Sequence, residues 1–175
     1  MMRELIRDIR ALKYEQLFGD TDYFIEYSEW LSKLKIDKSL SLKIMDIGCD
    51  NFVSLYQYLR FKNYNISEYY GYDLNFSIIK KQDTIQKKDT QLSYIEFMDN
   101  LAIINFLKID CEGCEDNWIE FLDQTNFPDM YYSIAIHTFS LNYDYNKQIL
   151  KQNNFKLAYI TPDKKEYLYV RRMKR

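Results

Sequence analysis

The sequence predicts an α/β fold: a Rossmann-like, doubly wound, mostly parallel sheet with strand order 3-2-1-4-5, closed by a carboxyl-terminal antiparallel hairpin. Short apolar runs that end in an acidic residue alternate with segments that repeat apolar residues at helical spacing. Such alternation is typical of parallel sheets with right-handed crossovers. The last stretch changes character, because FKLAYI (155–160), the turn TPDKKE (161–166) and YLYVRR (167–172) have the pattern of a β-hairpin.

The first half of the chain contains two of these strands. Apolar residues recur at helical spacing in the flanking segments, for example at Phe24, Tyr27 and Leu31. The predicted helices are 1–18, 22–36, 52–62 and a helix that Asn75 caps and that runs to about residue 88. The predicted strands are 42–47, bounded by Gly48, and 69–73, which ends in Asp73.

The second half continues the alternation before the hairpin. The predicted strands are 92–98, 103–110 and 132–137, and the predicted helices are 116–125 and 144–153. Near-continuous apolarity in 103–110 indicates a strand that is buried on both faces.

Composition narrows the functional classes. At 175 residues the chain is expected to form a single domain, 1–175, in which residues 1–40 form a helical cap. A net charge of −2 gives no electrostatic case for a nucleic-acid partner. The sequence has no apolar run long enough to span a bilayer and no signal-peptide core, so the expected location is the cytoplasm, with no membrane partner. Its three cysteines, an odd number, fit a reducing compartment in which the thiols are reduced.

Acidic residues at successive strand ends indicate a nucleotide-type cofactor site. Asp46 and Gly48 close the first strand, and Asp73 closes the second about 25 residues later. Gly48 lets a cofactor pass close to the backbone, and Asp73 is placed to bond the two ribose hydroxyls of a ligand such as S-adenosylmethionine. Asp99 could reach an adenine amino group. The alternative is a cofactor-free α/β domain with acids at its strand ends.

One stretch, LKIDCEGCE (107–115), resembles the KID-x-EG-x-E signature of the FkbM-type methyltransferases. The matching positions are Lys108, Ile109, Asp110, Glu112, Gly113 and Glu115. Weaker similarities are DIGCDN (46–51), MDNL (98–101), YSIAIH (132–137) and NNFKL (153–157). The resemblance implies class I architecture, S-adenosyl-L-methionine as cofactor and O-methylation of a small hydroxylated acceptor such as a sugar, glycan or metabolite. The implied cofactor-binding residues are Asp46, Gly48, Cys49, Asp73, Leu74, Asp99 and Asp110.

The sequence also departs from the family pattern. Asp50 and Phe52 stand where glycine usually recurs in the first loop, and Ala135 replaces a glutamate of the fifth strand. The alternative function is therefore a catalytically degenerate binding or scaffold module with a methyltransferase fold. A nucleic-acid methyltransferase is a third hypothesis, but the Asp/Asn-Pro-Pro-aromatic signature of base-amino methyltransferases is absent.

The candidate catalytic residues are His137, Asp110 and Glu112. Methyl transfer needs positioning and removal of a proton from the acceptor hydroxyl, and an imidazole with a pKa of about 6.5 suits that task. The alternatives are a histidine that only hydrogen-bonds at its strand end, and carboxylates that face a metal or bond the backbone of their own turn.

The cysteines offer a rival site. Cys49, Cys111, Cys114 and His137 would make a complete tetrahedral zinc set, and Cys111-x-x-Cys114 could act as a redox dithiol. The simpler interpretation is that these are small, partly buried side chains, so that no metal is expected. The sequence names neither the acceptor nor the oligomeric state. Trp30 and Tyr23 are expected in the core, with the lining of an acceptor pocket as the alternative.

Overall fold

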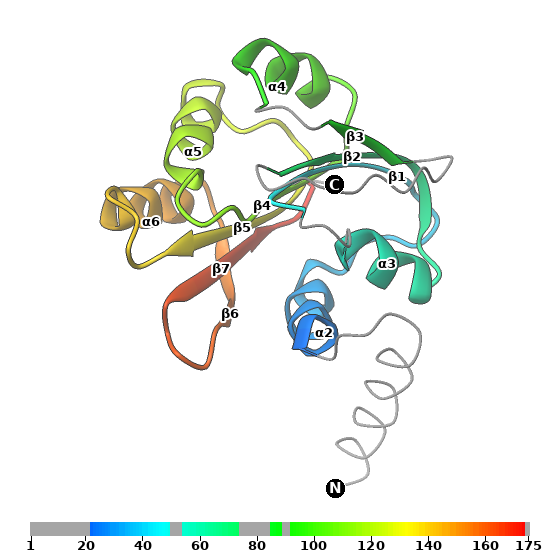
Figure 1. Cartoon of the computed structure of the whole chain (residues 1–175), viewed down its shortest axis with the longest axis horizontal. Coiled ribbons are helices and arrows are strands. Elements are labelled where there is room, and N and C mark those ends of the chain that lie inside the picture. The colour runs from blue at the N-terminus through cyan, green and yellow to red at the C-terminus, as the bar shows by residue number, and fades with distance from the viewer. Residues whose placement is uncertain (1–21, 50–53, 74–84, 89–91, 174–175) are drawn as a thin grey trace, which may run out of the picture.

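The computed structural model describes residues 22–49, 54–73, 85–88 and 92–173 (Figure 1). The predicted helix 1–18, the loop residues Asp50 and Phe52, and Leu74 and Asn75 lie outside the described residues.

One mixed sheet organises the described residues, and it confirms the predicted fold class. Its seven strands run in the order β3-β2-β1-β4-β5-β7-β6. Neighbours from β3 to β5 pair in parallel, whereas β7 pairs antiparallel with both β5 and β6. The strands are β1 (Ser41–Ile47), β2 (Asn65–Tyr72), β3 (Ile85–Lys88), β4 (Phe106–Ile109), β5 (Tyr131–His137), β6 (Lys156–Ile160) and β7 (Glu166–Arg171).

Helices cover both faces of this sheet (Figure 1). The described helices are α2 (Asp22–Leu34), α3 (Ser54–Phe61), α4 (Tyr94–Leu101), α5 (Glu115–Gln124) and α6 (Tyr143–Gln152). One hydrophobic cluster joins α2 and α3 to the sheet, and a second joins α4, α5 and α6 to it. The molecule is therefore a three-layer α/β/α structure.

Alternation along the strands produces these two faces. In β1, Leu42 and Ile44 belong to the α2 and α3 cluster, and Met45 and Ile47 belong to the other. Every residue of β4 and β5 is buried. Strands covered by helices on both faces show this continuous burial, as the apolar run of β4 predicted.

The predicted strand 92–98 is wrong, because the structure forms α4 there. Ser93 caps this helix: its hydroxyl accepts a hydrogen bond from the Glu96 backbone N–H, and the Glu96 carboxylate accepts one from the Ser93 N–H. This is a capping box, whose S-x-x-E signature is present in the sequence.

The third strand lies earlier, at β3, so the predicted helix is wrong over residues 85–88. β3 pairs in parallel with β2, with Ile85 opposite Tyr69. β2 itself begins at Asn65, four residues before the predicted start, and β4 is shorter than the predicted 103–110.

The described part of the predicted cap is packed on the sheet. Trp30 is fully buried and its ring meets Phe106 edge-on, so it belongs to the core, as expected. The side chain of Tyr23 lies outside the described residues. No helix in the described ranges combines the length and apolar character that crossing a bilayer requires.

Candidate active site at the carboxyl edge of the sheet

Side-chain alternation brings polar residues together on the α2 side of the sheet. Phe106 lies in the core of that side, so Lys108 and Asp110 follow it toward the same side. By the same alternation, His137 follows Tyr131 on β5, and Glu166 precedes Leu168 on β7. The carboxyl ends of β4 and β5 meet the amino end of antiparallel β7, so these polar groups share one edge of the sheet.

A buried ion pair forms the floor of this edge. Lys108 Nζ lies 3.1 Å from Asp46 Oδ1, and both side chains are almost fully buried. Lys108 also donates to the Gly48 carbonyl at 3.1 Å, and the Tyr69 hydroxyl donates to Asp46 Oδ2. Burial alone lowers the pKa of Lys108, but the charges of Asp46 and Asp110 outweigh it and raise this pKa far above its usual range. Lys108 therefore stays charged.

Gly48 is required by the close approach of β1 and β4. Its φ is +77°, and a Cβ added there would lie 1.6 Å from the carbonyl oxygen of Asp110. The Gly48 and Cys49 backbone N–H groups both donate to the Tyr72 carbonyl, at 2.8 and 3.2 Å. The first two residues after β1 are thus held by the neighbouring strands.

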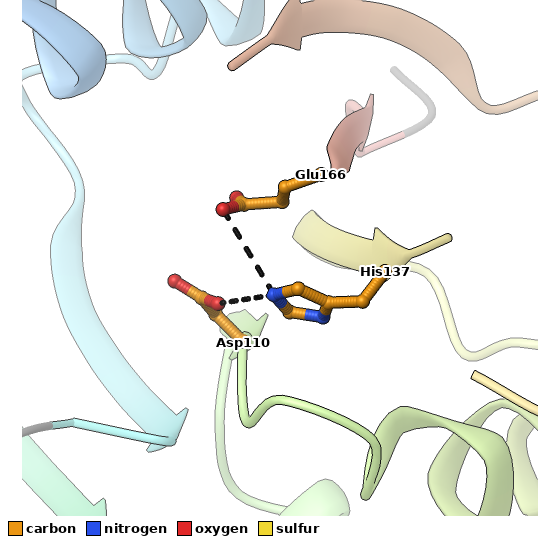
Figure 2. A group of neighbouring side chains, drawn as sticks. All are labelled: Asp110, His137 and Glu166. Carbon is orange, nitrogen blue, oxygen red and sulfur yellow. Dashed lines mark ion pairs between the residues drawn. The ribbon is translucent and has the colours of Figure 1, made fainter. Parts of the chain in front are cut away.

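Three side chains at the sheet edge form what we call the edge triad: Asp110, His137 and Glu166 (Figure 2). His137 Nε2 lies 4.0 Å from Asp110 Oδ1 and 3.9 Å from Glu166 Oε2. His137 and Glu166 are direct partners in the antiparallel register of β5 and β7. The imidazole edge that carries Nε2 therefore faces both carboxylates.

Glu115 fixes the orientation of the His137 ring. Its Oε1 lies 3.0 Å from His137 Nδ1, and it also accepts hydrogen bonds from the His137 backbone N–H at 3.1 Å and from the Ser140 hydroxyl. Burial alone raises the pKa of Glu115, but the hydrogen bonds from His137 and Ser140 outweigh it and lower this pKa to about 2. An ionised Glu115 accepts a hydrogen bond from the His137 Nδ1–H, which leaves Nε2 facing the edge triad.

Excess carboxyl groups set the electrostatics of the edge. Burial raises the pKa of Glu166 to about 7, and the nearby charge of Asp110 adds to this shift. Burial also raises the pKa of Glu26, on α2, to about 8, again with help from Asp110 and Glu166. Burial alone lowers the pKa of His137, but its contact with Glu115 and the charges of the two triad carboxylates raise it overall.

Comparisons with known proteins bear on this fold. No protein-family model matches the chain, and no curated protein matches it. A solved structure assigned as a ribosomal RNA methyltransferase, from Plasmodium falciparum, is 16% identical over 85% of this chain and 93% of its own, with a TM-score of 0.59. The methyltransferase FkbM from Methylobacillus flagellatus KT is 14% identical with a TM-score of 0.50. The alignment covers 97% of this chain but only 60% of FkbM, so the chain spans about three fifths of that protein.

The chain has a methyltransferase fold. Both structures are less than 25% identical to it, so the likeness concerns the fold alone. In this fold the strand order reverses between β1 and β4, and open α/β sheets bind ligands at the carboxyl side of such a reversal. The edge triad lies on the β4 side of that point.

Among the predicted cofactor residues that the structure describes, Asp46, Gly48, Cys49 and Asp73 lie at the carboxyl ends of β1 and β2, whereas Asp110 follows β4 and belongs to the edge triad. Asp73 directly follows β2 and is half-buried. Asp46 and Cys49 are buried, and Asp46 is held by Lys108 and Tyr69. Asp99 is exposed on α4, whereas its neighbour Asn100 donates to the Tyr72 hydroxyl at 2.7 Å.

Of the three predicted catalytic residues, two come together and one does not. His137 and Asp110 come together in the edge triad, but Glu112 is exposed, with a φ of +50° in the turn before α5. The sequence analysis missed Glu26 and Glu166, and it quoted Glu115 only as part of a motif. The place of Glu115 in the KID-x-EG-x-E resemblance was the available signal for this residue. Neither Glu26 nor Glu166 has a local signal.

The predicted zinc set is not assembled in the methyltransferase fold. Cys111 and Cys114 form a disulfide with their Cα atoms 5.4 Å apart, so neither is a thiolate ligand. The turn between them, in which Glu112 and Gly113 both have positive φ, brings them together. The Cys49 thiol is buried outside this disulfide and packs beside Gly71 of β2. The expectation that all three thiols are reduced is likewise wrong for this pair.

Proposed function

We propose that the chain is an S-adenosylmethionine-dependent methyltransferase of the FkbM type that methylates a hydroxyl group of a small acceptor. One observation carries the proposal. The carboxyl edge of the methyltransferase fold holds Asp73 on the β2 side of the strand-order reversal and the edge triad on the β4 side. This arrangement provides one place for a nucleoside and another for an acceptor. The KID-x-EG-x-E resemblance supports the FkbM type.

The residues at the β2 end fit the nucleoside part of this cofactor. Asp73 is a half-buried carboxylate at the end of the second strand, where it can accept hydrogen bonds from two ribose hydroxyls. Gly48 and Cys49 would flank the cofactor through their backbone. When bound, the sulfonium cofactor supplies an already activated methyl group.

The edge triad can remove the proton from the acceptor hydroxyl. In the cation-free protein, the neutral form of His137 is the proton acceptor at Nε2, because Glu115 holds Nδ1 and turns Nε2 toward the sheet edge. Because the pKa of His137 is raised, activity that depends on this form should increase with pH through that pKa. Asp110 and Glu166 then stabilise the imidazolium that forms, since each lies within 4.0 Å of Nε2. Lys108 and Asp46 support Asp110 from below, with Lys108 Nζ 3.4 Å from Asp110 Oδ2.

Cofactor binding tests this proposal directly. Saturation with S-adenosylmethionine or its demethylated product should raise the melting temperature, since a ligand present at 100 times its Kd adds about 2.7 kcal/mol. Asp73→Ala should remove most of that increase. Glu120→Gln, which changes an exposed carboxylate of α5, is the matched control and should keep it. No shift for the unmodified chain would contradict the proposal.

A second candidate function is a binding module that has lost the cofactor. Two observations favour it: Tyr72 already accepts the Gly48 and Cys49 backbone N–H groups, and Lys108 engages Asp46. This candidate predicts no melting shift with either ligand. A net charge of −2 makes a nucleic-acid partner the less favoured choice under both candidates.

A further inference from the structure

We propose that the edge triad of Asp110, His137 and Glu166 is a binding site for a divalent cation, for which Mn²⁺ is a suitable probe. Each of the three residues offers one ligand atom, and these atoms all lie within 4.8 Å of one another. Figure 2 shows all three side chains pointing into the same space from the ends of β4, β5 and β7. No other such group of three occurs among the residues that the structure describes.

The ligand atoms need only a small closure to hold an ion. Ligands bound at about 2.1 Å from one metal ion stand roughly 3.0 to 3.5 Å apart at octahedral or tetrahedral angles. The two distances from His137 Nε2 are 4.0 and 3.9 Å. Side-chain rotations that move each carboxylate by about an ångström would bring all three separations, which are at most 4.8 Å, to this geometry.

An unsatisfied oxygen points independently to a ligand. Glu166 Oε1 is buried, and within the described residues no hydrogen-bond donor reaches it. A buried carboxylate oxygen without a partner is costly, and a bound cation or its water would satisfy it.

The support of His137 is that of a metal ligand. The ring is 7% exposed, and Nδ1 lies 3.0 Å from the fully buried Glu115. Metal-ligating histidines generally donate their other ring N–H to a carboxylate or carbonyl, which fixes the tautomer and the ring orientation.

The donor set suits a hard or borderline divalent ion. Two carboxylates with one imidazole are harder ligands than the thiolates of structural zinc sites. Carboxylates suit Mn²⁺ and imidazole suits Zn²⁺ or Fe²⁺, and Mn²⁺ is the probe because electron paramagnetic resonance detects its binding. In the scheme proposed above, such an ion would bind the acceptor oxygen, and Nε2 would then be a ligand instead of the proton acceptor. That extension rests on the proposed function, whereas the cation site itself does not.

Mn²⁺ binding to the full chain, without S-adenosylmethionine, tests the site. Titration followed by electron paramagnetic resonance should show one Mn²⁺ bound per chain with micromolar affinity. Glu166→Gln should weaken binding by at least about tenfold. Glu120→Gln, which alters an exposed acid of α5, is the matched control and should leave the affinity within about twofold.

Spin-echo modulation of the bound Mn²⁺ supplies a readout on the unmodified chain. It should detect nitrogen coupling from one imidazole, and His137→Gln should abolish that coupling. Absence of stoichiometric binding, absence of nitrogen coupling, or undiminished affinity in a folded Glu166→Gln variant would overturn the site. The melting shift with S-adenosylmethionine is measured separately, so failure of the cation site and failure of the proposed function are distinguishable.

Discussion

At the scale of single residues, Gly48 and Lys108 hold the carboxyl edge together. Gly48 has no Cβ where the Asp110 carbonyl passes, and its positive φ is unfavourable for other residues. Lys108 neutralises Asp46 beneath the edge triad and also lies near Asp110. Both residues position the backbone and the charges that a ligand at this edge would meet.

Gly48→Ala should destabilise the fold by about 3 kcal/mol or more, because left-handed strain and a steric clash add. Urea denaturation followed by circular dichroism measures the free energy of unfolding. Gly71→Ala is the matched comparison: its added Cβ would meet the Cys49 side chain at 2.9 Å, and the cost should be about 1 to 2 kcal/mol. Equal costs for the two variants would contradict the role given to Gly48.

Lys108→Met should cost about 3 to 5 kcal/mol of unfolding free energy, because it leaves the buried Asp46 carboxylate without its cation. The double variant Asp46→Asn/Lys108→Met removes the stranded charge and retains an oxygen that can accept from Tyr69. It should recover at least half of the loss in the same denaturation experiment. A double variant as unstable as the single one would argue against the ion pair.

At the scale of elements, α4 shows where local sequence information was misread. The segment around Phe97 looks apolar enough for a strand, but Ser93 and Glu96 form a complete capping box and the helix prevails. For β3 there was no local signal to use. This four-residue strand is defined by its pairing with β2, which no local pattern reveals.

Ser93→Ala should lower the stability by about 1 kcal/mol, since it leaves the Glu96 backbone N–H without the hydroxyl acceptor. Ser32→Ala in α2 is the control, because it removes only an exposed hydroxyl that donates within its own helix. That control should change stability by a few tenths of a kcal/mol at most. Equal losses would show that the cap contributes nothing specific.

The carboxyl-terminal hairpin shows which parts of the candidate site could be predicted from the sequence and which could not. Its two strands and the strand ending in His137 follow from local alternation, so they could be predicted. The juxtaposition of Glu166 with His137 depends on the register of β7 against β5, and the position of Glu26 near the charges of Asp110 and Glu166 depends on how α2 packs. Both contacts are long-range, and short-range patterns carry no information about them.

At the scale of the whole molecule, the reversal of strand order between β1 and β4 separates the two groups of residues to which we assign the proposed cofactor and cation sites. Asp73 follows β2 on one side of this reversal. The edge triad lies at the ends of β4, β5 and β7 on the other side. A cofactor and a cation can therefore be bound by different residues of the same sheet.

This separation predicts a reciprocal pattern of losses. Asp73→Ala should abolish the melting shift with S-adenosylmethionine while it leaves the Mn²⁺ affinity within about twofold. Glu166→Gln should weaken Mn²⁺ binding by at least about tenfold, while it leaves the melting shift with S-adenosylmethionine unchanged. Calorimetric titration of both variants with both ligands measures the pattern, and loss of both ligands in either variant would contradict two separate sites.

A crystal of the full chain grown with the demethylated product of S-adenosylmethionine tests the central claim most directly. The account predicts electron density for the nucleoside at the carboxyl ends of β1 and β2, with the ribose hydroxyls against Asp73 and the thioether directed toward the edge triad. An edge without ligand density at saturating concentration, or one closed by the side chains of the protein itself, would contradict it.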